Sequence, residues 1–130
     1  SLTHVETVAR WAKVILIGGE IRPERLDVCG SLAEKTLSIF HVTKAFFGAD
    51  AVSLKWGFMT TDERTAKMNE IVVEHADGFY VLVDSSKFDR SSFVTYASLQ
   101  AAERIFTDGG IHRQTLQAYT EAGARIEVLR

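Results

Sequence analysis

Cysteine is nearly absent from this sequence, and so are long apolar runs and an excess of positive charge. Cys29 is the single cysteine among 130 residues, so no disulfide can form within the chain, and a cytoplasmic location is expected. The longest apolar runs have four or five residues, too few to span a bilayer, so no membrane association is expected. The formal net charge of -2 argues against direct DNA binding, because duplex affinity depends on Lys and Arg neutralising phosphates.

The remaining composition is that of an ordinary folded domain. Hydrophobic residues make up 46% of the chain and charged residues 25%. A chain of 130 residues suits one domain, and no repeat, low-complexity tract or linker divides it. We therefore expect residues 1–130 to form a single domain. Because the chain begins with Ser1 rather than Met, we also expect it to be a piece of a longer protein.

Short apolar runs alternate with helical patterns along the chain. Runs rich in β-branched and aromatic residues predict strands at 14–17, 45–47, 79–83, 105–107 and 126–129. Apolar residues spaced by three and four predict helices at 5–12, 32–40, 68–75 and 116–122, the last ended by Gly123. The segment 93–96 is either a further short strand or an extended loop. This alternation indicates an α/β fold, a doubly wound, mainly parallel sheet with helices on both faces.

Small and polar residues follow the expected strands, at the turns where open α/β sheets bind ligands. Glycines in such turns let backbone N–H groups approach an anion, which predicts a site for a phosphate or a polyol. Asp50 suits sugar hydroxyls as a hydrogen-bond acceptor, and Lys87 offers a mobile cation for a phosphoryl oxygen. The candidate ligand-binding residues are Gly18, Gly19, Arg22, Gly48, Asp50, Gly57, Glu63, Lys67, Ser85, Ser86 and Lys87.

The same residue types also have structural uses, and these alternatives stay open. Gly, Asp and Ser are common wherever a strand turns into a helix. Glu63 and Lys67 have the spacing of an ion pair on an exposed helix, and Thr60 with Glu63 fits a capping box. Trp56 could stack on a sugar, cover the site or pack into a partner subunit. The four histidines have no ligand-like spacing with one another or with Cys29, so we expect neither a metal site nor a cofactor.

Several motifs follow one another in the order of a known family. They are Ile17-Gly18-Gly19, Arg22 with Gly30, Gly48-Ala49-Asp50, Gly57, the helix carrying Glu63 and Lys67, Val83-Asp84-Ser85-Ser86-Lys87-Phe88, and Ile105-Phe106-Thr107-Asp108. From about Val5 to Leu129, the chain resembles the C-terminal effector-sensing domain of DeoR-family transcriptional regulators. The resemblance implies a bacterial repressor of sugar metabolism. Such a repressor binds DNA through an N-terminal helix-turn-helix that lies outside this chain, and a phosphorylated sugar or related metabolite in the sensor domain modulates that binding.

The resemblance also implies what this chain lacks. Family members have a first strand and a Gly-Thr-Thr-like loop suited to phosphate, and Thr3 corresponds to a position just beyond that loop. The sheet is therefore expected to lack its N-terminal strand, and the chain alone to bind its effector weakly. A homo-oligomer is expected, because a symmetric dimer matches the symmetry of a repeated or palindromic operator.

The chain is also similar, more distantly, to ribose-5-phosphate isomerase, which shares the fold. Those enzymes carry an Asp-Gly-Ala-Asp loop, but here Phe47 stands at the first aspartate, and 56–59 replaces a glycine-rich run. Moving a proton between adjacent carbons needs a positioned carboxylate, so we expect no enzymatic activity, although Glu63 could take the place of a base. Three hypotheses remain: a ligand-sensing regulatory module, a sugar-phosphate isomerase, and an association module that senses nothing.

Overall fold

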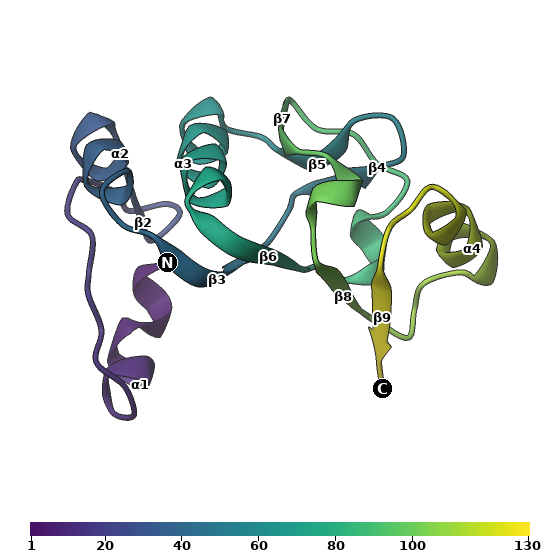
Figure 1. Cartoon of the computed structure of the whole chain (residues 1–130), viewed down its shortest axis with the longest axis horizontal. Helices are drawn as coiled ribbons and strands as arrows, with labels where there is room; N and C mark the ends of the chain where they lie inside the picture. Colours follow the sequence, from purple (N-terminus) through teal and green to yellow (C-terminus); the bar gives the residue numbers. More distant parts are fainter.

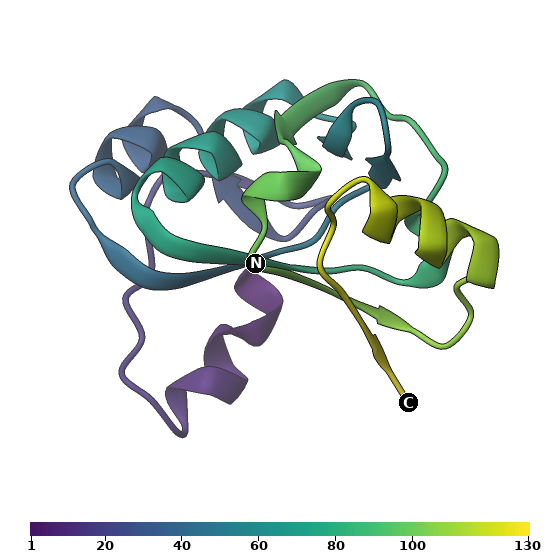
Figure 2. The same cartoon turned by 45° about the vertical axis from the view of Figure 1, so that its right-hand side comes forward.

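A parallel sheet of four strands runs through the computed structural model, which describes residues 1–130 (Figure 1). Its order is β3 (Val42–Phe47), β6 (Ala76–Leu82), β8 (Arg104–Asp108) and β9 (Ile126–Leu129). All three pairings are parallel, and the connections between these strands pass over one side of the sheet (Figures 1 and 2). The predicted α/β fold with a mainly parallel sheet is confirmed.

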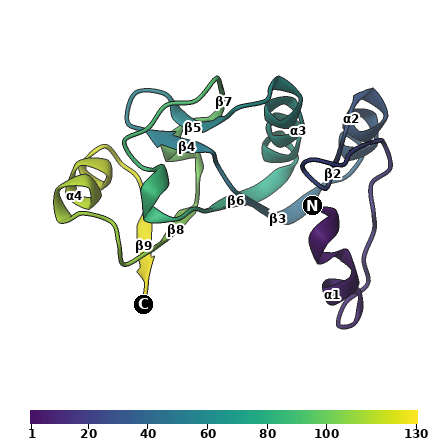
Figure 3. The same ribbon diagram turned by 180° about the vertical axis from the view of Figure 1, so that it is seen from behind.

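The helices lie on both faces of this sheet, but unevenly. On one face lie α2 (Ser31–Leu37), α3 (Glu63–Glu74) and α4 (Arg113–Glu121), and α1 (Val5–Ala9) lies on the other (Figures 1 and 2). None of these helices combines the length and the apolar character that a membrane span requires. The view from behind shows the same layering (Figure 3).

Two small antiparallel units complete the structure. A three-stranded sheet, β4 (Ala51–Ser53), β5 (Gly57–Thr60) and β7 (Val94–Ala97), lies beside α3 and above the main sheet (Figure 1). A hairpin of β1 (Glu20–Arg22) and β2 (Asp27–Cys29) precedes α2. Short 3-10 turns are η1 (Leu2–His4), η2 (Ser85–Lys87) and η3 (Leu99–Ala101).

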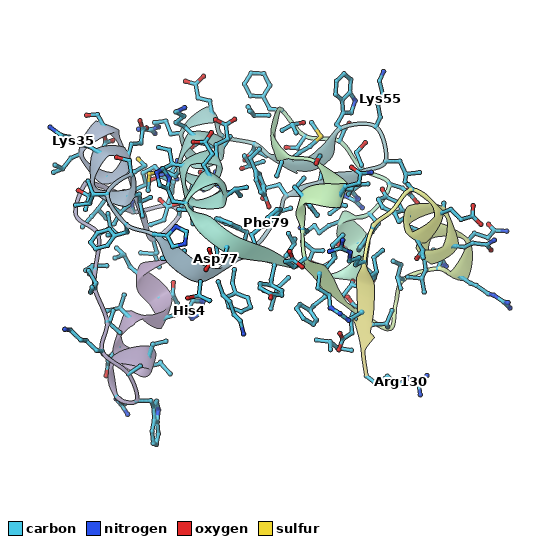
Figure 4. The ribbon with its side chains drawn as sticks, viewed as in Figure 1. His4, Lys35, Lys55, Asp77, Phe79 and Arg130 are labelled. Carbon is cyan, nitrogen blue, oxygen red and sulfur yellow. The ribbon has the colours of Figure 1, made fainter.

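The hydrophobic core lies between the main sheet and the layer that holds α3, α4 and the small sheet. Alternate residues of β6 show this, because Phe79 and Val81 are buried while Leu82 on the opposite face is exposed. In Figure 4, Phe79 extends from β6 on the core side. One continuous cluster of buried side chains runs from Ala45 to Ala124. Residues beyond 109 therefore share the core of those before it.

Tyr119 of α4 is the largest side chain that is fully buried. Its hydroxyl donates a hydrogen bond to the carbonyl oxygen of Val52 at 2.8 Å and accepts one from the N–H of Asp89 at 3.0 Å. Its ring meets Phe88 edge to face, with ring centroids 5.1 Å apart. One side chain thus joins α4 to β4 and to the loop after β6.

The strand predicted at 14–17 is wrong. No backbone hydrogen bond joins these residues to another segment, and Ile15 and Leu16 are exposed. An apolar run forms a strand only beside a strand that accepts and donates its hydrogen bonds. The opening helix is shorter than predicted, and Trp11 beyond it is 87% exposed. Of the segment 93–96, residues 94–96 lie in a strand, β7, and Phe93 precedes it.

The predicted start of α3 is also wrong. The N-cap residue is Asp62, whose carboxylate accepts hydrogen bonds from the N–H groups of Arg64 and Thr65 at 2.7 and 3.3 Å. Thr60 lies in β5 and forms no capping box. The expected ion pair between Glu63 and Lys67 is absent as well, because Lys67 pairs with Glu70 at 3.7 Å.

We predict that Tyr119→Phe lowers the free energy of unfolding by about 1 to 2 kcal/mol, because one buried backbone carbonyl and one partly buried N–H lose their partner. Urea unfolding followed by circular dichroism measures this. Tyr80→Phe is the matched control, since the Tyr80 hydroxyl makes no hydrogen bond within the chain. Equal losses of stability in the two variants would contradict the role given to the Tyr119 hydroxyl.

Candidate functional site

Arg22, at the end of β1, is a buried cation that joins distant parts of the chain. Its side chain is 4% exposed. Its Nε and Nη2 donate to the two carboxylate oxygens of Asp27 at 2.7 and 2.6 Å, and Nη2 also donates to Thr65 Oγ1 at 2.9 Å. Nη1 donates to Asp62. The hydrogen bond with Asp27 raises the pKa of Arg22, against the opposing effect of burial.

The donors of Arg22 are thus used within the protein. The carboxylates of Asp27 and Asp62 hold the guanidinium, and the bond to Asp62 ties the β1–β2 hairpin to the first turn of α3. Arg22 was a candidate ligand contact. In this structure it positions the hairpin, and a direct role in binding stays a prediction.

Asp50 follows β3, and its side chain is 40% exposed. Its Oδ2 accepts hydrogen bonds from Thr60 Oγ1 at 2.9 Å, from Thr61 N–H at 2.9 Å and from Thr61 Oγ1 at 3.3 Å. Partial burial raises the pKa of Asp50, but these hydrogen bonds and the charge of Arg25 outweigh it and hold the pKa below its usual value. All of these bonds reach Oδ2, so Oδ1 is free to accept a hydrogen bond from a ligand.

Arg25 is a site residue that sequence analysis missed. It lies in the turn between β1 and β2, with its side chain 31% exposed. Its guanidinium nitrogens lie 3.8 Å from Asp27 and Asp62 and 3.9 Å from Asp50. No sequence signal distinguishes it from a solvated arginine, because only the folded hairpin brings it to Asp50.

A second polar turn follows β6. The N–H and hydroxyl of Ser85 donate to the two carboxylate oxygens of Asp108 at 2.7 and 2.9 Å, and the N–H of Ser86 donates to Asp84 at 3.0 Å. The hydrogen bond from the Ser86 hydroxyl lowers the pKa of Asp84, and the N–H groups of Ser85 and Gly110 lower that of Asp108. The turn is therefore held by ionised carboxylates at neutral pH.

Lys87 closes the same turn and has no carboxylate within ion-pair distance. Its side chain is half-buried. An ammonium group with no partner in the protein is available to an anionic ligand. Ser85 and Ser86 border a pocket of about 260 Å³ that Gly110, His112 and Thr115 also line.

The loop after β3 and the turn after β6 are neighbours. The hydroxyl of Tyr96 donates to the carbonyl oxygen of Gly48 at 2.8 Å, and burial, with the nearby charge of Asp50, raises the pKa of Tyr96. Val52 and Phe88 form a parallel bridge. The segments that contain Val52 and Phe88 run in the same direction. Asp50 comes shortly before Val52, and Lys87 comes just before Phe88, so Asp50 and Lys87 lie toward the same end of the bridge. We call Arg25, Asp50, Ser85, Ser86 and Lys87 the carboxyl-edge cluster.

The other candidate residues lie apart from this cluster or support the backbone. Gly57 has a φ of 76°, and a Cβ there would lie 2.3 Å from the carbonyl oxygen of Ala97, so it is needed for the β4–β5 turn. A Cβ on Gly19 would lie 2.7 Å from a backbone oxygen of β2. Gly18, Glu63 and Lys67 are exposed. Their roles in binding stay predictions.

Trp56 does not cover Asp50. It lies at the tip of the β4–β5 hairpin, where Lys55 stacks over its ring at 4.6 Å, and Figure 4 shows Lys55 at this outer tip. Asp50 lies at the other end of the same hairpin, about 10 Å away for strands of three residues. The structure thus removes the lid hypothesis for Trp56.

A larger pocket than the one beside Ser85 and Ser86 lies away from the carboxyl-edge cluster. It has a volume of about 490 Å³ and lies between α1, residues 14–17 and the end of β3. Its lining is mainly aliphatic and aromatic, with Arg22 and Asp27 at one side. Such a lining suits apolar groups rather than a sugar phosphate, so the polar cluster is the stronger candidate site, although the pocket beside Ser85 and Ser86 is smaller.

Phe47, at the position of the isomerase aspartate, is part of the core. Its ring lies 5.8 Å from that of Phe79 and 5.9 Å from that of Tyr96, between ring centroids. The one carboxylate left in this loop is Asp50, and Glu63 is exposed on α3.

The fold and the carboxyl-edge cluster together define the class of the domain. It is an α/β domain that presents polar groups at the carboxyl ends of its strands, where small molecules bind in such folds.

Comparisons with known proteins agree with this class. The family described as "DeoR C terminal sensor domain" matches residues 1–109. The chain therefore belongs to the DeoR family, as a C-terminal sensor domain, and this family is a sensor family rather than an enzyme family.

Several curated relatives are named as regulators. A protein of Escherichia coli O157:H7 named for repression of the aga operon is 32% identical over 91% of this chain and 44% of its own length. The HTH-type transcriptional regulator GlpR of Haloferax volcanii is 31% identical over 88% of the chain and 45% of its own length. The lactose phosphotransferase system repressor of Staphylococcus epidermidis is 29% identical over 84% and 44%. The chain thus spans less than half the length of these relatives.

We predict that Asp62→Asn destabilises the protein most near neutral pH. Hydrogen bonds and Arg22 hold the pKa of Asp62 below its usual value despite partial burial, so the ionised carboxylate stabilises the fold above the unfolded pKa of about 3.9. This contribution is lost as the pH falls through the lower folded pKa. The difference in unfolding free energy between wild type and variant, about 1 to 2 kcal/mol at pH 7, should therefore shrink below about pH 4.

Urea titrations between pH 3 and pH 7 measure this difference. Glu63→Gln removes the same charge one residue away, where the side chain is exposed, and should show a smaller and flatter effect. A deficit for Asp62→Asn that stays constant over the whole pH range would contradict the ion pair with Arg22.

Proposed function

We propose that this domain binds a phosphorylated sugar, or a chemically related polyol phosphate, at the carboxyl-edge cluster. The observation that carries the proposal is the state of Asp50. Its carboxylate is ionised, fixed through Oδ2 by Thr60 and Thr61, and open at Oδ1. A fixed carboxylate oxygen without a partner accepts hydrogen bonds from sugar hydroxyls at little cost in ordering.

The phosphate end of the ligand requires cations and N–H donors. Lys87 supplies an unpaired ammonium group, and Arg25 supplies a guanidinium that carboxylates approach only at 3.8 to 3.9 Å. An anion between these two groups would gain close contacts that neither cation has within the chain. A ligand with hydroxyls at one end and a phosphate at the other matches both halves of the cluster.

The regulatory role follows from the family. The relatives named above are transcriptional regulators, and the chain corresponds to less than half of each. DNA contact therefore belongs to another part of the full-length protein. The ligand changes DNA binding only if it favours one of two states of that protein over the other. The β1–β2 hairpin, which carries Arg25 and is held by Arg22, is the element we propose to differ between the two states.

We predict that Asp50→Asn weakens binding of the effector about 10- to 100-fold, the loss of one charge-assisted hydrogen bond of about 1.5 to 3 kcal/mol. A thermal-shift screen of phosphorylated sugars against full-length protein finds the ligand, since a ligand at 100 times its Kd adds about 2.7 kcal/mol. Calorimetry then gives the two affinities. Asp77→Asn is the matched control, because Asp77 contacts only His41 at the other end of β6. Equal affinity in wild type and Asp50→Asn would refute the site.

We predict that Lys87→Met weakens binding of a sugar phosphate by about tenfold, yet leaves the affinity for the unphosphorylated sugar unchanged, because the ammonium contacts only the phosphate. Competition calorimetry with both ligands measures this. The full-length variant should bind operator DNA as wild type does and lose its response to the phosphate. Lys55→Met, at the hairpin tip, is the control. A loss of affinity for both ligands alike would show that Lys87 does not mark the phosphate end.

A further inference from the structure

The turn that carries Lys87 is held by a carboxylate from the neighbouring strand. Asp108 is the last residue of β8, which lies beside β6 in the main sheet (Figure 1). Its Oδ2 accepts a hydrogen bond from the N–H of Ser85 at 2.7 Å. Its Oδ1 accepts hydrogen bonds from the Ser85 hydroxyl at 2.9 Å and from the N–H of Gly110 at 2.8 Å. One side chain thus bridges the ends of two strands.

The space around this bridge is closely filled. A Cβ at Gly110 would lie 2.6 Å from the Ser85 hydroxyl oxygen and 2.7 Å from Asp108 Oδ1. A side chain at Gly110 would therefore displace one of these two groups, and glycine at this position keeps the bridge intact.

A second set of contacts holds the far end of the same turn. The Thr115 hydroxyl of α4 donates to Asp89 Oδ2 at 2.8 Å, and the N–H of Asp89 donates to the Tyr119 hydroxyl at 3.0 Å. Phe88, between Lys87 and Asp89, is buried. The turn is therefore fixed by β8 at its start and by α4 at its end.

Within the turn, the donors of both serines are already used. Ser85 gives its N–H and its hydroxyl to Asp108. Ser86 gives its N–H and its hydroxyl to Asp84. The N–H of Lys87 closes the turn on the carbonyl oxygen of Asp84 at 3.1 Å, but its ammonium group has no carboxylate within ion-pair distance. The ammonium of Lys87 is therefore the group of this turn that is free for an anion.

A carboxylate beside a phosphate site opposes binding through its charge, because like charges repel. Asp108 offers three acceptor contacts instead, and these fix the backbone on which Lys87 stands. A ligand then has to order only the lysine side chain, and not the turn as well, which lowers the entropic cost of binding.

We infer that Asp108 is a positioning residue for the phosphate end of the site: it fixes the turn through Ser85 and so presents Lys87 to the phosphate. This inference rests on the proposed function, which places the phosphate at Lys87. It assigns to Asp108 a role in binding without contact with the ligand.

Amide relaxation measured by nuclear magnetic resonance on the full-length protein tests the fixing of the turn without any ligand. In Asp108→Asn, which loses an acceptor oxygen, the order parameters of the Ser85 and Lys87 amides should fall from about 0.85 to below about 0.6. Asp77→Asn is the matched control, because Asp77 is exposed near the start of β6 and pairs with His41. It should leave both values unchanged. Unchanged order parameters in Asp108→Asn would overturn the inference.

Inorganic phosphate is the probe for the effect on binding. Asp108→Asn should raise the Kd of the full-length protein for phosphate about threefold to tenfold, although the loss of a negative charge alone would lower it. In a Lys87→Met background it should have no further effect, because Asp108 acts through the lysine. Ser85→Ala keeps the carboxylate and loses one hydrogen bond, so it should raise the Kd in the same direction even if Asp108→Asn folds poorly.

The same titrations distinguish this inference from the proposed function. Phosphate affinity that is unchanged or tighter in Asp108→Asn, or weakened equally with and without Lys87, would overturn the positioning role alone. If Lys87→Met itself leaves phosphate affinity unchanged, the phosphate end lies elsewhere, and the proposed function fails together with the inference.

Discussion

The arrangement of this domain depends on one buried guanidinium. Arg22 holds Asp27 within its own hairpin and reaches Asp62 and Thr65, about forty residues further along the chain. Burying a charge costs several kcal/mol unless carboxylates and hydroxyls surround it, and here two carboxylates and a hydroxyl do. The contact fixes the β1–β2 hairpin against α3. As a result Arg25, three residues after Arg22, stands beside Asp50 rather than in open solvent.

In and around the carboxyl-edge cluster, hydrogen bonds within the protein already hold the carboxylates in place before a ligand binds. N–H and hydroxyl groups of the turns hold Asp50, Asp84 and Asp108 ionised, as their lowered pKa values show. Arg25 lies 3.9 Å from Asp50, and Lys87 has no carboxylate within ion-pair distance. A ligand that brings both hydroxyls and a phosphate would use the open oxygen of Asp50 and the two cations, and little of the protein would need to be reordered.

Sequence patterns predicted a strand correctly where an apolar run also has neighbouring strands to pair with. They failed where the pairing between strands, and not the local pattern, determines whether a strand forms. The apolar run at 79–83 became β6 because β3 and β8 lie on either side of it. The similar run at 14–17 has no neighbouring strand and stays irregular. The β1–β2 and β4–β5 hairpins were missed because strands of three residues, several of them polar, carry too little periodicity to recognise.

The candidate site was predictable to a similar extent. Asp50 and the Ser85-Ser86-Lys87 turn follow strands, and the rule that ligands bind at the carboxyl ends of strands predicts that they lie together. The Val52–Phe88 bridge joins the two segments, and their role in binding stays a prediction. Arg25 was missed because its role comes from a hairpin that no local pattern predicts. Asp62 was overlooked as the N-cap of α3 because the spacing of Thr60 and Glu63 also fitted a capping box. Only the structure shows that Thr60 is the last residue of β5, so the helix is capped by Asp62 instead.

The most direct test of the account is a nuclear magnetic resonance titration of the full-length protein with the sugar phosphate that stabilises it. If the carboxyl-edge cluster is the site, the backbone amide signals that shift first and furthest should be those of Thr61, Ser85, Ser86 and Gly110, together with the turn that carries Arg25. Shifts confined to α1 and the apolar pocket beside β3, with these amides unmoved, would contradict it.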